Sequence, residues 1–153
     1  NLRTGERSAI RPVRQAGAGN VAWSARFAPY GALVLRVFLG VIYIAHAYLA
    51  LVVMGPAKAV EFQRAMHIPL PEIGVWYLIV AHGLGGILLI LGLLVRWAAL
   101  ANIPVIAGAL WFVHLQQGFF ILGGKAGYEY VLVLLGATIA QALLGPGAFT
   151  LKK

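Results

Sequence analysis

Four long apolar stretches, separated by short polar connections, follow a polar N-terminal part of the chain. The clearest is 76–96, WYLIVAHGLGGILLILGLLVR, which matches the ~20 helical residues needed to cross the hydrocarbon core of a bilayer. The other stretches cover 30–54, 97–117 and 128–144. Because the backbone must satisfy its own hydrogen bonds in lipid, this pattern predicts four membrane-spanning helices.

The connections between the stretches refine this picture. Residues 57–66 carry Lys58, Glu61 and Arg64 at every third position, with apolar residues on another face. This pattern is typical of a short amphipathic helix that lies on the membrane surface. The turn at Arg96 is very short, so the spans on either side of it are antiparallel neighbours. We therefore predict an all-α polytopic membrane protein, an antiparallel bundle of four transmembrane helices with one amphipathic surface helix between spans 1 and 2.

Composition supports a membrane protein and excludes several other classes. Hydrophobic residues make up 61% of the 153 residues and charged residues only 10%, whereas soluble domains have roughly 25% charged residues. The net charge of +8 comes largely from arginines in the first 29 residues, so membrane orientation explains it better than nucleic-acid binding. The chain has no cysteine, which excludes disulfides, thiolate metal sites and thiol catalysis within it.

Basic residues also predict the orientation of the bundle. We divide the chain into a basic cytoplasmic tail (1–29), a membrane domain (30–147) and a short basic C-terminus (148–153). The two terminal segments and the turn at Arg96 together carry most of the basic residues, while the opposite loops carry few. By the positive-inside rule, this multi-pass protein of the cytoplasmic (inner) membrane has both termini in the cytoplasm.

Each predicted span contributes one titratable group, and the groups have similar depths. At ~1.5 Å per helical residue, His46, His82, His114 and Glu129 all lie toward the outer surface. Ionisable residues within spans face the interior of a bundle and pair with one another. We therefore expect these four side chains to form one polar layer near the outer leaflet.

Small or aromatic residues share the helix faces of these groups. Gly85 and Gly86 lie three and four residues after His82, and small residues let helix backbones approach closely. Tyr43 shares a face with His46, and Trp111 shares one with His114. On the last span, Gly136 and Ala140 share the face of Glu129, and we expect a neighbouring helix to pack closely there.

Several interpretations of this layer remain open. It can be a hydrogen-bond network that only fixes the bundle. It can bind a quinone headgroup, since histidine or tyrosine donates to a carbonyl and Glu129 is a suitable base. His46, His82 and His114 could instead hold a metal ion, although their spacing is no known motif. A bis-histidine haem is the remaining alternative.

Arginines near the cytoplasmic side are expected to meet lipid or partners. Arg36 lies one to two turns into the first span, where its side chain can extend to the inner headgroups or bind a lipid phosphate or a partner. Arg14 and Arg26 belong to the tail, which is expected to lie near anionic lipid or to dock on another membrane-protein subunit.

Several segments between residues 35 and 151 form a recognisable pattern: Leu35-Arg36, Gly40 and His46, GGILLILGLLVRWAAL (85–100), His114 with Gly118-Phe119-Phe120, Gly127-Tyr128-Glu129-Tyr130 and Gly145-Pro146-Gly147. In these segments the sequence resembles the DoxX family of small four-helix bacterial membrane proteins. The chain departs from the family pattern at His82, where a glutamate is usual, and at Ala47-Tyr48-Leu49-Ala50, which replaces a glycine and a lysine.

The resemblance implies a four-helix bundle with both ends in the cytoplasm. It also implies a link to quinone-reducing thiosulfate oxidation, or an accessory role beside redox-stress or assembly complexes. We therefore expect a membrane subunit of an oxidoreductase or electron-transfer complex, with a quinone-type site made by His46, His82, His114, Glu129, Trp111 and Tyr43. The alternative is a non-catalytic accessory subunit of a larger respiratory or photosynthetic complex.

Overall fold

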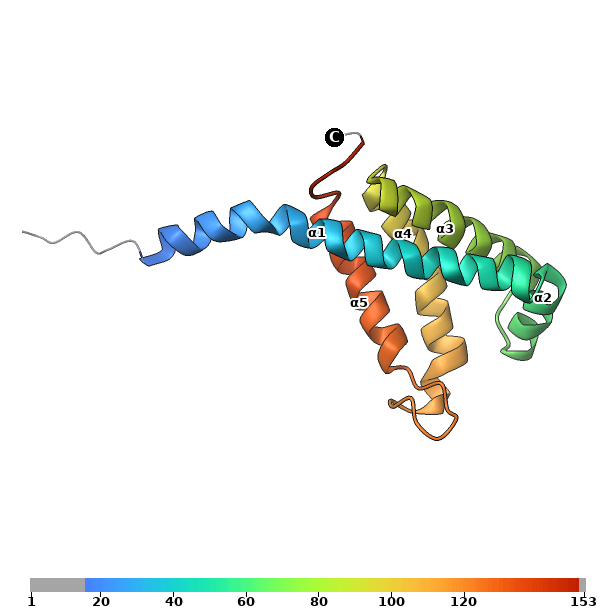
Figure 1. Ribbon diagram of the computed structural model, residues 1–153. Helices are drawn as coiled ribbons and strands as arrows, with labels where there is room; N and C mark the ends of the chain where they lie inside the picture. Colours follow the sequence, from blue (N-terminus) through green and yellow to red (C-terminus); the bar gives the residue numbers. More distant parts are fainter. Residues whose placement is uncertain (1–15, 152–153) are drawn as a thin grey trace, which may run out of the picture.

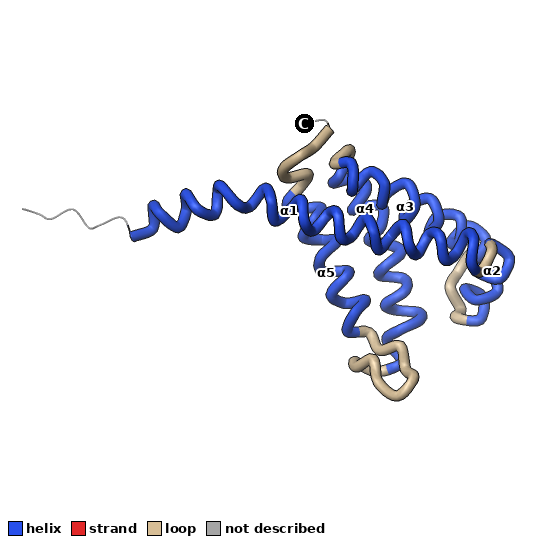
Figure 2. The backbone as a smooth tube through the Cα atoms, in the orientation of Figure 1, coloured by secondary structure: helices blue, strands red, loops and turns tan. Residues whose placement is uncertain are grey.

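The computed structural model describes the backbone of residues 16–151 and the side chains of residues 22–151. All regular structure in that part of the chain is helical (Figure 2). In chain order the helices are α1 (Ala16–Tyr48), η1 (Leu49–Val53), α2 (Pro56–Ala65), α3 (Pro71–Leu91), α4 (Val95–Gly108), η2 (Ala109–His114), η3 (Leu115–Gln117) and α5 (Glu129–Leu144). Segments η1 and η2 are π-helical, and η3 is a 3₁₀ turn.

Three continuous helical stretches are long and apolar enough to cross a membrane: Ala22–Val53, Pro71–Leu91 and Val95–Gln117. Helix α5 is apolar but shorter. The prediction of an all-helical membrane protein is thus confirmed, and three of its helical stretches have the length and composition of a span. The sequence also predicted a fourth span and a regular four-helix bundle. Helix α5 is too short for its length alone to establish these two predictions.

Helix α1 begins well before the predicted first span. The sequence interpretation placed a tail up to residue 29, but α1 already starts at Ala16 and passes through Pro29. Alanine is frequent in this segment and favours helix. The early part of α1 extends away from the other helices (Figure 1). The amide of Ala148 donates to the carbonyl of Pro29, which ties the C-terminal segment to α1 where the packed part of the helix begins.

Helices α1 and α3 pack closely along their length because two glycines face each other. A Cβ atom at Gly86 would lie 2.8 Å from the carbonyl oxygen of Gly40, and one at Gly40 would lie 2.7 Å from that of Gly86. Gly85 lies against α4 instead, where a Cβ would come within 2.6 Å of Asn102 Nδ2. The predicted close packing around His82 is therefore confirmed. A Cβ atom at Gly136 on α5 would meet nothing within 4 Å, so the packing predicted there is wrong.

The amphipathic helix predicted over 57–66 corresponds to α2. It starts at Pro56 after Gly55, whose positive φ of 79° suits glycine, and proline is well suited to a first helical position. Ala59 and Gln63, one turn apart, are the buried residues of α2. An exposed ion pair between Arg64 and Glu72 links α2 to the start of α3.

The turn from α3 to α4 takes only 92–94, so the connection is short as predicted, but it lies before Arg96, which belongs to α4. Helices α4 and α5 pack on each other, but they run away from the direction of α1 and α3 toward the 118–128 loop (Figure 1). The two helix pairs therefore diverge at the end that holds α2 and this loop. The main apolar core consists of Leu39, Tyr43, Leu89, Val95, Ala98, Ile106, Val131 and Leu134.

We predict that Gly86→Ala lowers the thermal stability of the detergent-solubilised protein by about 1–3 kcal/mol, because the new methyl group would overlap the α1 backbone. The matched control is Gly136→Ala, where the Cβ meets open space and the loss of backbone entropy in the unfolded chain favours the variant. Equal melting temperatures for the two variants would contradict the close α1–α3 contact.

Candidate functional site

His82 is buried between α3 and α4, where its side chain bonds to Asn102. The residue is 5% exposed, and its Nδ1 bonds to Asn102 Oδ1. Asn102 Nδ2 donates to the carbonyls of Ala81 and Ala98 at 2.9 and 2.8 Å. Since both Asn102 amide hydrogens are used in this way, its oxygen is the acceptor and His82 carries the proton on Nδ1. The pairing joins α3 to α4.

Tyr43 extends this polar layer to α1 and α5. Its ring stacks on the His82 ring with a centroid distance of 4.7 Å. The Tyr43 hydroxyl bonds to Thr138 Oγ1, and Thr138 in turn donates to the Leu134 carbonyl at 2.7 Å. The hydroxyl of Tyr43 is therefore the donor to Thr138. Side chains from α1, α3, α4 and α5 thus meet in one layer: Tyr43, His82, Asn102 and Thr138.

His46 lies at the edge of this layer. Its ring meets the His82 ring edge-on, with centroids 6.1 Å apart. His46 Nδ1 bonds to the carbonyl of Ile42 at 2.8 Å. Because a carbonyl only accepts, the neutral imidazole has its proton on Nδ1 and a lone pair on Nε2.

His114 and Glu129 do not join His46 and His82. His114 Nδ1 bonds to the Ala126 carbonyl at 2.7 Å, and Glu129 Oε1 accepts from the amide of Ile121 at 2.8 Å. Both side chains therefore order the 118–128 loop. The sequence placed the four groups at one depth, but depth does not fix lateral position, and the divergence of α4 and α5 separates them.

Two further sequence interpretations change for the same reason. Among residues 22–151, no three His, Cys, Asp or Glu side chains come together as a metal-ion site, so the alternative of His46, His82 and His114 as ligands is wrong for this arrangement. Trp111, expected to share a helix face with His114 and to belong to the quinone-type site, is 66% exposed and does not line the cavity described below.

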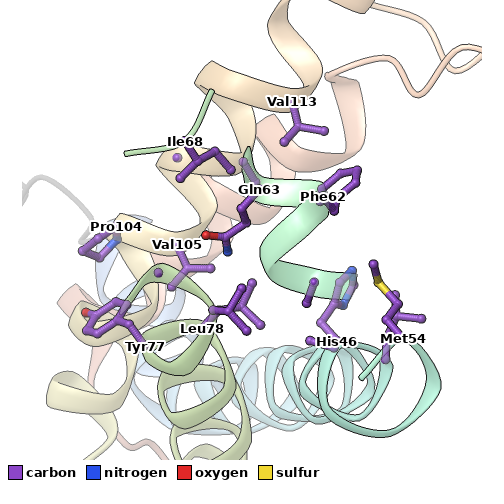
Figure 3. A pocket seen from close by; sticks show the side chains of 17 residues that line it. His46, Met54, Phe62, Gln63, Ile68, Tyr77, Leu78, Pro104, Val105 and Val113 are labelled. Carbon is purple, nitrogen blue, oxygen red and sulfur yellow. The ribbon is translucent and has the colours of Figure 1, made fainter. Parts of the chain in front are cut away.

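A cavity of about 290 Å³ lies where the helix pairs diverge, between α2, α3, η1 and the α4–η2 helix. Figure 3 shows the side chains around it, with the Gln63 amide near the centre and His46 at one edge. Most of the lining is apolar: Leu49, Ala50, Met54, Ala59, Phe62, Ile68, Val75, Leu78, Pro104, Val105, Ala109 and Val113. Gly74 and Gly108 complete the wall together with Tyr77.

Three of the lining residues have polar side chains. Tyr77 uses its hydroxyl as a donor to the Ala101 carbonyl at 2.8 Å. Gln63 is 7% exposed, and its Oε1 is buried without a hydrogen-bond partner. His46 is the third. An apolar cavity with few polar groups is the usual form of a small-molecule site.

Both π-helical segments line the cavity, η1 through Leu49 and Ala50, and η2 through Ala109 and Val113. Short π segments within α-helices are frequent at functional sites. Pro104, which lies inside α4, is also part of the wall. The residues that depart from regular α-helix thus gather at this cavity.

Sequence reasoning missed Gln63, Asn102 and Thr138 because it followed titratable side chains only. A signal was present for each of them. Asn102 and Thr138 are polar residues within apolar stretches, and Gln63 follows Ala59 by one helical turn on α2.

Three arginines were predicted to contact lipid or a partner: Arg36, Arg26 and Arg14. Arg36 is 1% exposed, so the prediction that it reaches headgroups or a partner is wrong. Its guanidinium donates to four carbonyls, those of Leu89 and Ile90 at the end of α3 and those of Ala148 and Phe149. Arg26 lies over the Phe27 ring at 5.6 Å from its centroid, while Arg14 lies outside the described residues.

Comparison with known proteins identifies the family. A family model described as DoxX matches residues 31–115, more than half of the chain. The chain belongs to the DoxX family. In this DoxX chain the matched range includes His46, Gln63, His82 and Asn102 and ends before Glu129. No curated protein and no solved structure gave a match in the corresponding searches.

We predict that Arg36→Met destabilises the protein by about 2–4 kcal/mol, because hydrogen bonds from a charged donor to four carbonyls are lost. Thermal unfolding in detergent measures the loss. The exposed Arg96 provides the control, and Arg96→Met is expected to change the melting temperature little. Similar melting temperatures for both variants would contradict the structural role of Arg36.

Proposed function

We propose that this DoxX-family chain is a small integral membrane subunit of an oxidoreductase or electron-transfer complex, and that it holds a quinone-type ring in the cavity between α2, α3, η1 and η2. The observation that carries the proposal is the apolar cavity, whose lining includes a few polar side chains, among them those of Gln63 and His46. A mostly apolar cavity with a few polar groups is the usual form of a small-molecule site.

The chemistry of the lining suits an amphiphilic aromatic ligand. Quinones combine an apolar ring and tail with two oxygen substituents, which require a mostly apolar site with a few placed polar groups. Phe62 and Tyr77 contribute aromatic rings to the wall, and His46 and Gln63 contribute polar atoms. In this proposal His82 and Tyr43 support the site from behind His46 rather than lining it.

The orientation in the membrane is part of the proposal. We propose that α5 is the fourth span, that residues 30–147 form the membrane domain and that both termini face the cytoplasm. The bonds of Arg36 support this arrangement, because they hold the end of α3 and the C-terminal segment together at one end of the molecule. The cavity would then lie toward the outer leaflet, and a partner subunit would exchange electrons with the bound ring.

A second candidate is the accessory, non-catalytic subunit. It is favoured by the early part of α1, which extends beyond the packed helices (Figure 1). Trp23 and Phe27 are exposed there and pack on each other with a centroid distance of 4.9 Å. A partner subunit could pack on this part of α1 without any ligand in the cavity.

Filling the cavity tests the first candidate. Gly108 lines the cavity, and a Cβ atom there meets nothing within 4 Å, so Gly108→Leu has room to occupy the space without displacing the backbone. We predict that this variant binds a benzoquinone with a decyl tail about tenfold more weakly than the unchanged protein. Isothermal titration calorimetry in nanodiscs measures the affinity.

The matched control is Gly136→Leu, because Gly136 also has open space around its Cα but lies outside the cavity. This control is expected to bind the quinone normally. If the unchanged protein does not bind the quinone, or if Gly108→Leu binds it equally well, the proposed site is wrong. Recovery of lipid acyl chains alone from the purified protein would also count against it and favour the accessory role.

A further inference from the structure

We propose that residues 119–122, in the loop between η3 and α5, insert their side chains into the bilayer leaflet at that end of the protein and complete the crossing that α5 begins. Lipid, rather than a partner subunit, then covers the surface that these side chains form. The proposal rests on α5 being the fourth span, which is part of the proposed function, and it is independent of any ligand in the cavity.

The loop presents an apolar surface that the rest of the protein leaves largely uncovered. Four consecutive side chains are between 43 and 76% exposed: Phe119, Phe120, Ile121 and Leu122. A contiguous exposed apolar surface marks contact with a protein or a membrane. Exposed apolar side chains also border the loop along the chain, Trp111 and Leu115 before it and Leu132 and Val133 after it. Those four lie on stretches assigned to the membrane, so the loop continues a lipid-facing surface.

Helix α5 alone is too short to cross the hydrocarbon core. Its 16 residues rise about 24 Å at ~1.5 Å per residue, whereas the core is ~30 Å thick. The 119–122 segment meets the start of the helix, because the Glu129 amide donates to the Phe119 carbonyl at 3.0 Å. The apolar side chains of this segment therefore lengthen the apolar surface of α5 at its N-terminal end.

The backbone of the loop is paired in the way that a boundary with hydrocarbon favours. The amide of Ile121 donates to Glu129 Oε1 at 2.8 Å. Ala126 is held on both sides, since its amide donates to Gln117 Oε1 at 2.9 Å and its carbonyl accepts from His114 Nδ1 at 2.7 Å. Backbone groups without partners are unfavourable near lipid chains, so these bonds let an irregular segment lie at the membrane boundary.

Other residues of the loop place it at this boundary rather than in the middle of the bilayer. The Phe119 ring meets the Tyr128 ring edge-on, with centroids 5.2 Å apart, and tyrosine is enriched at membrane interfaces. Gly123 and Gly124 have positive φ values of 62° and 79°, and they turn the chain before the exposed Lys125. The Lys125 ammonium can reach the headgroups while the apolar segment lies ~5–10 Å deep, at the start of the acyl chains.

Single-cysteine labelling tests the proposal directly, because the chain has no cysteine of its own. A bimane label is attached in turn to Phe120→Cys, Leu122→Cys, Lys125→Cys and Ile139→Cys, all at exposed positions. Each full chain is placed alone in a nanodisc, so no second copy covers the label. Phospholipids brominated near the carbonyl end of the acyl chains quench labels at the boundary, those brominated near the terminal methyl quench deep labels, and iodide quenches labels in water.

We expect the labels at Phe120 and Leu122 to lose more fluorescence to the shallow bromines than the label at Lys125, and less to iodide. Lys125 is the matched control because it belongs to the same loop. Ile139, in the middle of α5, reports on the span itself, and its label is expected to lose most fluorescence to the deep bromines. Both Phe120 and Leu122 must give the expected pattern, so a local disturbance by one substitution cannot support the proposal.

The outcomes separate this proposal from the function it rests on. If iodide quenches the labels at Phe120 and Leu122 as strongly as the label at Lys125, the loop lies in water and the proposal is wrong. Protection from both iodide and the bromines also rejects it, because protein then covers the segment. If either result comes with deep quenching at Ile139, α5 still crosses the membrane and only the loop proposal fails. A label at Ile139 that only iodide quenches rejects the fourth span as well.

Discussion

Polar side chains inside an apolar helical protein must find partners within the protein, because hydrocarbon offers them none. Here the pairing of His82 with Asn102 is the interaction on which the rest of the arrangement depends. It holds α3 against α4, and the His82 ring stacks on Tyr43 of α1. Tyr43 bonds in turn to Thr138 of α5. The layer specifies which helices are neighbours, whereas apolar packing alone has little directional preference. At the opposite end Arg36 fixes the end of α3 and the C-terminal segment in a similar way.

The cavity follows from where this layer lies and from where the helices diverge. Beyond the layer α4 and α5 run away from α1 and α3, and the space between the pairs is covered by α2 (Figures 1 and 3). The π-helical segments η1 and η2 face that space, and Gln63 of α2 enters it. His46 connects the two regions, because its ring meets His82 on one side and the cavity on the other. A ligand in the cavity would therefore contact His46, which in turn contacts His82 of the polar layer.

The sequence predicted the helices well because each apolar stretch carries its own signal in length and composition. Gly85 and Gly86 also indicated which face of α3 is buried. The polar residues at every third position along 57–66 indicated α2. The start of α1 was missed because charged residues before Pro29 suggested a tail, although they are compatible with a helix. The candidate site was predicted in part. His46 and His82 do meet, but the positions of His114, Glu129 and Arg36 depend on crossing angles and loop contacts that a single sequence does not encode locally.

The tautomers of the histidines test the central claim most directly, because each one records the direction of a hydrogen bond. The ¹⁵N spectrum of the histidine side chains in nanodiscs, assigned with His46→Gln and His82→Gln, distinguishes protonation at Nδ1 from protonation at Nε2. For a neutral ring, the structure predicts the proton on Nδ1 in both His46, bonded to Ile42, and His82, bonded to Asn102. A proton on Nε2 of His82 would contradict the polar layer, and a proton on Nε2 of His46 would contradict its bond to the Ile42 carbonyl.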